Sequence, residues 1–381
     1  SGQLGEESSR AAPMAELERI FSVAENNLST EIDSFFDSWK QLSANPAGQT
    51  ERQIVLQRGD LLARSFDDAV TSLRGSQRNI NASIESKITA INPVLQEIAD
   101  LNLRISTVEI SGQSANSDRD RRDMLIEQIS RELGATYYEE NGKVSLQLPG
   151  GQPLVQDTEA MTLEPQLDAS LNLQLVLRTG PSSTTELSSD MVGGEFRGLM
   201  NVRDEIIPDR MAELDHLAFT LAEEVNTKHG AGYDRNGDPG LAFFAPGVEA
   251  GYAKAMKVND ALDTSLIAAG GDNTGIGDNR NALDIAALAD DLTVMDGDDS
   301  FTGYFSKITS KVGIEAARAQ TSAQGLEDAM VQIRNMRDAT VGVSLEEEMV
   351  DLMQYQKGFE ASAKFLAVVD ELMESLLTLK R

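Results

Sequence analysis

The sequence contains no cysteine, which excludes disulfide bonds, thiol chemistry and cysteine-ligated metal sites within its 381 residues. Histidine is almost as scarce, because His216 and His229 are the only two. They stand too far apart in the chain to bind one metal ion from adjacent turns of a helix. We therefore expect no transition-metal site.

Aromatic residues are also few, at 5% of the chain, although 40% of the residues are hydrophobic. This composition favours a helical bundle over an aromatic-lined substrate pocket. No apolar run reaches about 18 residues, and the amino-terminal stretch lacks the features of a secretory signal, so we expect neither membrane insertion nor Sec-type export. The formal net charge of −29 disfavours nucleic acid and anionic lipid as partners.

Motifs for catalysis or cofactor binding are absent. The sequence has no H-E-x-x-H, no G-x-x-x-x-G-K-[ST] and no G-x-G-x-x-G placed after a strand. Residues 234–240 begin like a calcium-binding loop, but Pro239 stands where that loop requires glycine and Ala245 where it requires glutamate. We interpret this segment as turns and expect no catalytic residue, no cofactor and no metal ligand.

Heptad spacing of apolar residues predicts long helices. The longest should cover residues 50–110, with Thr50 and Gln53 spaced as a capping box at its start and Pro93 kinking or dividing it. A second should run from about Phe196 to Val225, with Pro208 in the first turn of its second segment. Further helices are expected near residues 17–23, 28–45 and 305–333.

The middle of the chain has a different pattern. Asn141 and Gly142 predict a hairpin turn, and residues 149–151 predict a second turn. Apolar residues alternate with others from Leu171 to Leu177, which is the two-residue period of a half-buried strand. These signals indicate a small antiparallel β region.

We therefore predict a mainly α fold with inserted β (α+β), an elongated long-helix bundle built from both ends of the chain plus a small antiparallel β insertion. The helical bundle should comprise residues 1–132, 191–230 and 280–381, of which about 358–381 extend toward an inner coiled coil. Residues 133–190 should form the small β region. Residues 231–279 should form a loop or β insertion, a reduced outer domain.

The last helix carries a long apolar stripe. Its start is marked by Ser344 and Glu347, which have capping-box spacing. Two registers of seven follow, made of Leu345, Leu352, Phe359, Leu366 and Met373, and of Met349, Ala363 and Leu377. Leaving about six such side chains in water would forgo on the order of 10 kcal/mol, so this stripe requires a partner.

Several blocks of sequence resemble one family. "LMQYQKGFEASAKFLAVVDEL" is similar to the carboxyl end of bacterial flagellar axial proteins, and most of all to the hook-associated protein 1 family, the first proteins of the hook-to-filament junction. "FFDSWKQLSANP", "GGEFRGLMNVRDEIIPDR", "VNTKHGAGYDRNGDPGLAFF" and "GDNRNALDIAAL" resemble that family in the same order. The family's first helical segment, with its Asn-rich stretch, is absent before Ser1, so the chain is expected to be amino-terminally truncated.

The resemblance implies a structural adaptor of the bacterial flagellum, not an enzyme. It implies hook protein, the second hook–filament junction protein and copies of the chain in a ring as partners. It also implies an export chaperone at the carboxyl-terminal region. The location implied is extracellular, reached unfolded through the flagellar type III apparatus.

The resemblance also assigns axial helix packing to the terminal stripe. The residues expected to carry it are Leu352, Phe359, Leu366, Val369 and Met373, although a core role for any of them fits nearly as well. The part from Leu345 to Tyr355 is expected to stay in the bundle. The alternatives are another axial protein, either a flagellin or the second junction protein, or a calcium-dependent adhesin on a helical stalk.

Overall fold

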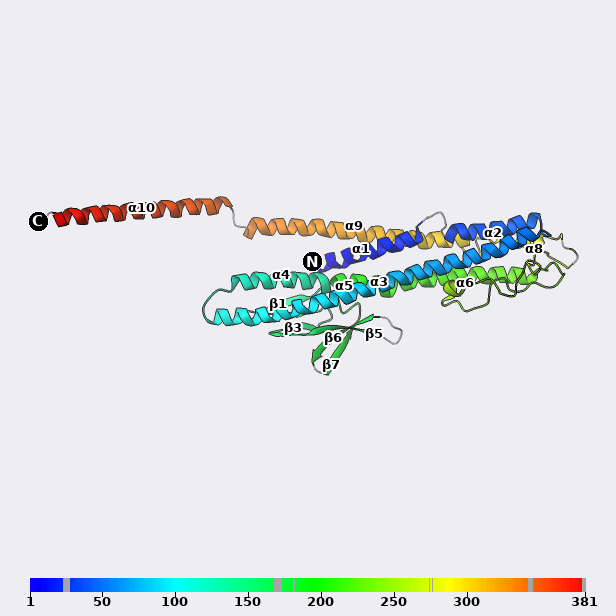
Figure 1. The fold of residues 1–381 in the computed structure, drawn as a ribbon, viewed down its shortest axis with the longest axis horizontal. Helices are drawn as coiled ribbons and strands as arrows, with labels where there is room; N and C mark the ends of the chain where they lie inside the picture. The colour runs from blue at the N-terminus through cyan, green and yellow to red at the C-terminus, as the bar shows by residue number, and fades with distance from the viewer. Residues whose placement is uncertain are drawn as a thin grey trace. The chain divides into compact units, whose positions relative to one another are not determined.

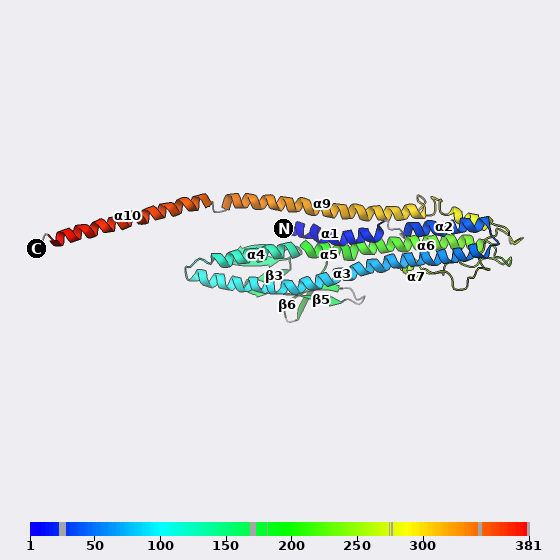
Figure 2. The ribbon, with the colours of Figure 1, turned by 45° about the horizontal axis from the view of Figure 1, so that its top comes forward.

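The structure is a computed structural model that describes residues 1–22, 28–167, 173–180, 182–273, 275, 277–341 and 345–378. It divides into two compact units, Ser1–Leu326 and Glu327–Arg381. The first unit holds α1 (Gly2–Phe21), α2 (Leu28–Ala44), α3 (Gln49–Ile110), α4 (Asn116–Leu133), two small sheets, α5 to α8 and the start of α9 (Phe301–Val341) (Figures 1 and 2). The predicted mainly helical fold with inserted strands is confirmed.

Helix α3 organises the first unit because the other elements pack along it. It has 62 residues, and its buried side includes the predicted apolar positions Ile84, Ile91 and Ile98. The prediction that Pro93 divides the helix is wrong. Pro93 lies on the exposed side, where water can solvate the carbonyl that loses its N–H partner. Burial of the apolar residues on both sides of Pro93 stabilises the continuous helix by more than the cost of proline in a helix interior, which is about 3 kcal/mol.

The start of α3 also differs from the prediction. Thr50 is not the capping residue, because the N-cap is Gly48 and no side chain caps the helix. A tight turn precedes it, in which the Gly48 N–H donates to the Asn45 carbonyl. The Asn45 amide in turn donates to the Glu51 carboxylate at 3.0 Å. This carboxylate in the first turn favours the positive end of the helix dipole, and it replaces the capping box.

Two antiparallel sheets are inserted between α4 and α5. Their strand orders are β1–β2–β3–β4 (Thr136–Glu140, Lys143–Gln147, Pro153–Gln156, Glu159–Ala160) and β5–β6–β7 (Thr162–Leu167, Leu173–Gly180, Ser183–Leu187). The predicted hairpin turn is confirmed: Asn141 and Gly142 have φ of 51° and 79°, as a type I′ turn requires. Leu173, Leu175 and Leu177 are buried, as the predicted alternation requires, but Val176 is buried as well, so the two-residue period is interrupted there. Leu171 lies outside the described residues.

A buried amide joins α3 to the first sheet. The Asn102 amide donates to the carbonyls of Val144 and Asp157, at 2.7 and 2.5 Å. Its oxygen accepts from the Val144 N–H and from Arg122 of α4, at 3.0 and 3.1 Å. Asn102 is fully buried, so no water can replace these partners. One side chain therefore holds helix, sheet and the α3–α4 pair in register.

Replacing Asn102 with alanine should lower the free energy of unfolding by about 3 kcal/mol, because the variant leaves buried polar groups without partners. Denaturant unfolding of the purified chain measures this value. Asn79→Ala is the matched control on an exposed position of the same helix, and it should change stability by less than about 0.5 kcal/mol. Equal losses of unfolding free energy in the two variants would show that the hydrogen bonds of Asn102 do not stabilise the fold.

The predicted two-segment helix around Pro208 is confirmed. Helix α5 (Gly194–Asn201) continues through a π-helical turn, η1 (Val202–Ile206), into α6 (Ile207–Ala231), with Pro208 in the first turn of α6. In a π-turn the Arg203 carbonyl would accept from residue 208, but proline has no N–H. Gln77 of α3 supplies the missing donor, and its amide lies 3.0 Å from that carbonyl.

The segment after α6 packs on the helices through an aromatic cluster. It contains α7 (Tyr252–Ala255) and α8 (Arg280–Ala287), and its Phe243 packs against Phe35, Trp39 and His229 with ring centroids 5.5 to 5.6 Å apart. The His229 Nδ1 donates to the Leu241 carbonyl, and Nε2 accepts from the Ala268 N–H at 2.9 Å. Burial lowers the pKa of His229 to about 4.

A buried arginine fixes the same segment from the other side. Arg52 of α3 donates to the carbonyls of Pro46, Thr264 and Ile267, at 2.9, 3.2 and 2.7 Å. Burial lowers the pKa of Arg52, as expected for a cation whose bonding partners are neutral carbonyls. The segment that was expected to form an outer domain is therefore tied directly to α3 and to the aromatic cluster.

Candidate functional site: the apolar surface of the terminal helix

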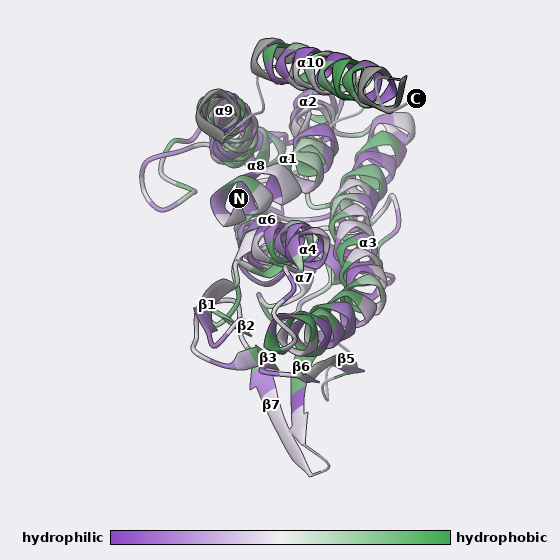
Figure 3. Cartoon of the chain, turned by 90° about the vertical axis from the view of Figure 1, so that its left-hand side faces the viewer, coloured by the Kyte–Doolittle hydropathy of each residue, from purple (hydrophilic) through white to green (hydrophobic). Residues whose placement is uncertain are grey.

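The terminal helix, α10 (Leu345–Thr378), presents its apolar residues to solvent. Every side chain from residue 349 to 374 is exposed. Hydrophobic residues recur along this helix, as Figure 3 shows in green. The five predicted packing residues have exposed fractions of 60% (Leu352), 77% (Phe359), 65% (Leu366), 38% (Val369) and 58% (Met373). We call these five the axial stripe.

The expectation that Leu345–Tyr355 stays in the bundle stays a prediction. Within the Glu327–Arg381 unit, Met349 and Tyr355 are 62% and 80% exposed, about as much as the residues beyond Gly358. Helix α10 runs through Gly358 without a break, so the two halves form one continuous element. The expectation that its apolar stripe has a partner also stays a prediction. Ser344, the predicted cap, lies outside the described residues.

A second apolar row on α10 was missed by the heptad count. Phe365, Val368 and Leu372 are 69%, 53% and 60% exposed. They are spaced three and four residues apart, so they share one side of the helix, and that side differs from the axial stripe. Spacing of three and four is a usable signal, but counting in sevens from Leu345 passes over it. The distal half of α10 is therefore apolar over a wider arc than one partner helix covers.

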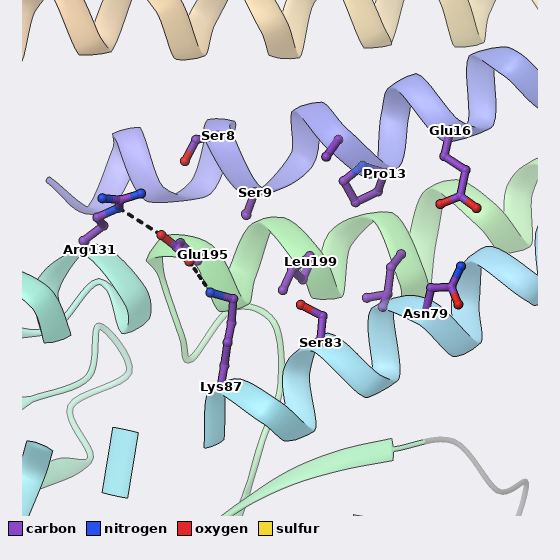
Figure 4. A pocket seen from close by; sticks show the side chains of 12 residues that line it. Ser8, Ser9, Pro13, Glu16, Asn79, Ser83, Lys87, Arg131, Glu195 and Leu199 are labelled. Carbon is purple, nitrogen blue, oxygen red and sulfur yellow. Dashed lines mark hydrogen bonds and ion pairs between the residues drawn. The ribbon is translucent and has the colours of Figure 1, made fainter. Parts of the chain in front are cut away.

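A groove with charged residues lies between α1, α3 and α5 in the first unit (Figure 4). It has a volume of about 450 Å³. The Glu195 carboxylate lies between the Lys87 ammonium and the Arg131 guanidinium, the latter at 2.9 Å. Lys87 is the residue that interrupts the heptads of α3, and this ion pair explains the interruption. The cluster joins α3, α4 and α5.

A serine hydroxyl in this groove would need a base beside it to act as a nucleophile. Its residues include serines but no histidine, so no imidazole base stands beside a hydroxyl. The Ser8 and Ser9 hydroxyls donate to the carbonyls of Gly5 and Glu6 instead. Among the described residues, no group of three or more His, Cys, Asp and Glu side chains could hold a metal ion. In the segment with the calcium-like start, the Asp234 carboxylate accepts from the N–H groups of Asn236 and Asp238.

Comparison with known proteins identifies the family. Residues 14–244, more than half of the chain, match the model of the flagellar hook-associated protein FlgK helical domain. The chain belongs to this family. Residues 339–379, which include all of α10, match a second model, the flagellar basal body rod FlgEFG protein C-terminal segment.

Relatives of the family cover nearly the whole chain. Flagellar hook-associated protein 1 of Bacillus subtilis is 25% identical over 97% of this chain and 79% of its own length. The protein of that name from Escherichia coli is 22% identical over 97% of this chain and 84% of its own. The flagellar hook junction protein FlgK of Burkholderia pseudomallei superposes with a TM-score of 0.79, covering 90% of this chain and 98% of that one at 17% identity.

Membership places the chain among the structural proteins of the bacterial flagellum, at the junction of hook and filament. This class of protein works through subunit contacts, so the exposed apolar surface of α10 is the feature to explain. No helix in the described part of the chain is long and apolar enough to cross a membrane.

Proposed function

We propose that this chain is a structural adaptor that joins the hook to the filament through helical packing between subunits. The axial stripe of Leu352, Phe359, Leu366, Val369 and Met373 carries that packing. The supporting observation is the exposure of all five side chains on one helix. Covering five large apolar side chains stabilises an assembly by roughly 1.5 to 3 kcal/mol each, on the order of 10 kcal/mol in total.

The second apolar row implies that α10 contacts more than one neighbouring helix. A single partner helix covers one seam, so Phe365, Val368 and Leu372 require another neighbour on a different side. We place residues from about 358 to 381 in an inner coiled coil, where each helix has neighbours on several sides. The 339–379 match to the carboxyl segment of rod proteins supports this, because those relatives share this terminal element.

The partners that fit this role are hook protein, the second hook–filament junction protein and further copies of the chain in a ring. An export chaperone at the carboxyl-terminal region fits the long apolar surface of α10, which would otherwise aggregate before assembly. Export unfolded through the flagellar type III apparatus fits a chain without disulfide bonds. These assignments rest on the family and on the exposed surface together.

The adaptor must also carry load, and the α3–α4 pair suits that purpose. Arg104, Arg119 and Arg121 form ion pairs across the two helices with Asp118, Glu109 and Glu97, at 2.6 to 2.8 Å. Each exposed pair contributes little alone, below about 1 kcal/mol. Together, the three ion pairs oppose sliding of α3 along α4 when the assembly is under load.

Replacing Phe359 and Leu366 together with aspartate should abolish filament attachment, because two charges enter the axial stripe. Cells lacking the native gene and carrying this variant should have hooks without filaments and shed flagellin into the medium. Electron microscopy of the cells measures this outcome. The thermal stability of the Ser1–Leu326 unit should be unchanged, because both substituted residues belong to the separate Glu327–Arg381 unit.

The matched control is Glu360→Gln with Glu374→Gln. It changes the net charge of α10 by two units as well, but on the side that carries neither apolar row. Cells with this variant should carry normal filaments. Normal filaments with the Phe359→Asp, Leu366→Asp variant would refute the packing role of the axial stripe.

A further inference from the structure

Exposed methionines are concentrated in the Glu327–Arg381 unit. Eight of the 13 methionines lie in the Ser1–Leu326 unit, and only Met124 among those eight is exposed. Five lie in the Glu327–Arg381 unit, and four of those five are exposed. Three of the four belong to α10, and they are Met349, Met353 and Met373, which are 62%, 53% and 58% exposed within their unit. Because the chain has no cysteine, methionine carries all of its sulfur.

The three methionines of α10 lie on two different sides of the helix. Met373 is the last member of the axial stripe. Met349 lies three residues before Leu352, so its side chain borders the first member of the same stripe. Met353 lies seven residues before Glu360, on the side that carries neither apolar row. We call Met349 and Met373 the seam methionines.

A thioether exposed to water is open to a two-electron oxidation. Its sulfur attacks the terminal oxygen of a hydroperoxide, so that an S–O bond forms while the O–O bond breaks. The sulfur loses two electrons to the peroxide, and the leaving oxygen takes the proton from the attacked oxygen and departs as water or an alcohol. The product is methionine sulfoxide, whose side chain is polar and whose oxygen accepts hydrogen bonds.

We propose that the seam methionines are an oxidation site through which hydroperoxides prevent the packing of α10. This inference rests on the proposed function and adds how that packing is regulated. A sulfoxide oxygen carried into an apolar seam needs a hydrogen-bond donor there. The N–H groups within a continuous helix already donate to carbonyls of the same helix, and the apolar side chains of the seam offer no donor. The oxidised oxygen therefore loses water without gaining a partner.

The oxidation acts on free subunits and spares assembled ones. Packing of the axial stripe covers Met349 and Met373, whereas Met353 stays in water on the opposite side. A subunit that is already in place is therefore protected, and a subunit that meets a peroxide before it packs is rejected. Enzymatic reduction of the sulfoxide restores the thioether, so the change is reversible.

Peptide mass spectrometry after treatment with hydrogen peroxide measures oxidation at each methionine. In the purified chain the seam methionines and Met353 should react at least tenfold faster than the buried Met14. In assembled flagella the seam methionines should react at least tenfold more slowly than in the purified chain, while Met353 keeps its rate. Equal rates at the seam methionines and Met353 in flagella, or slow oxidation of the seam methionines in the purified chain, would overturn the proposal.

Sedimentation with hooks isolated from cells that lack the native gene measures the effect on packing. Peroxide treatment should lower the amount of chain that sediments with the hooks at least tenfold, and methionine sulfoxide reductases for both epimers should restore it. The variant Met349→Leu with Met373→Leu keeps the apolar surface without its sulfur, so peroxide should leave its sedimentation unchanged. Met353→Leu is the matched control on the same helix, and it should stay as sensitive as wild type.

Equal sensitivity of the wild-type chain and the Met349→Leu, Met373→Leu variant would overturn the proposal, as would undiminished sedimentation of the oxidised wild-type chain. Failure of the proposed function gives a different result, because the untreated wild-type chain would then not sediment with the hooks.

Discussion

Replacing Gly198 with alanine should lower the free energy of unfolding by about 2 kcal/mol, although alanine is the better helix former. A Cβ atom at this position of α5 would lie 2.3 Å from the Glu6 carbonyl oxygen and 2.2 Å from the Ser9 hydroxyl. The Ser9 hydroxyl can rotate, but the carbonyl belongs to the backbone of α1. The two helices must therefore separate, and overpacking of this kind costs typically 1 to 3 kcal/mol.

Gly75→Ala is the control for this substitution. It places the same methyl group in the middle of α3, where the nearest atom is the end of the Arg78 side chain at 3.8 Å. This variant should gain about 0.5 to 1 kcal/mol, because it removes only the entropic cost of glycine in a helix. Denaturant unfolding of both variants gives opposite signs if α1 and α5 touch through Gly198. A gain in both would contradict that contact.

Acidification from pH 6.5 to pH 4 should remove about 3 kcal/mol of stability through His229 alone. Its pKa in the folded chain is about 4, below the ordinary value of 6.5, because burial disfavours the imidazolium. The unfolded chain therefore takes up the proton first as pH falls. The contribution of neutral His229 is complete above pH 6.5 and is lost progressively toward pH 4. A proton on Nε2 would also face the Ala268 N–H, which now donates to it.

Unfolding free energies measured between pH 4.5 and 7.5 test this loss. His229→Phe should be less stable at pH 7.5, because the Ala268 N–H loses its acceptor, and its stability should depend less on pH across the same range. His216→Gln keeps His229 and should keep the wild-type dependence. Parallel pH curves for wild type and His229→Phe would show that the buried imidazole does not control the acid response.

Patterns within one element were predictable from the sequence. The apolar rows of α3 and α10 follow from helical periodicity, and the type I′ turn follows from Asn141–Gly142, since both residues tolerate positive φ. The helix restart at Pro208 follows from the missing N–H of proline. Each of these features is decided by residues that are neighbours in the chain, so spacing alone carries the information.

Contacts between distant segments were not predictable. Lys87 interrupts a row of apolar residues spaced seven apart in α3, and nothing in its local sequence indicates the Glu195 carboxylate that it binds. The sequence around His229 likewise does not indicate that the imidazole packs against Phe243 and Trp39. The close approach of α1 to Gly198 likewise depends on how two helices cross. The stripe of α10 predicts that a partner exists, but spacing within one helix does not say which surface covers it.

Protection of α10 in assembled flagella tests the central claim most directly. Because the chain has no native thiol, Val369→Cys on the axial stripe and Glu360→Cys on the side that carries neither apolar row each carry a single reactive group. Both should react rapidly with an aqueous maleimide in the purified chain. In assembled flagella the Val369→Cys thiol should react at least tenfold more slowly, while Glu360→Cys stays reactive. Equal reactivity of Val369→Cys in the free chain and in flagella would contradict the account.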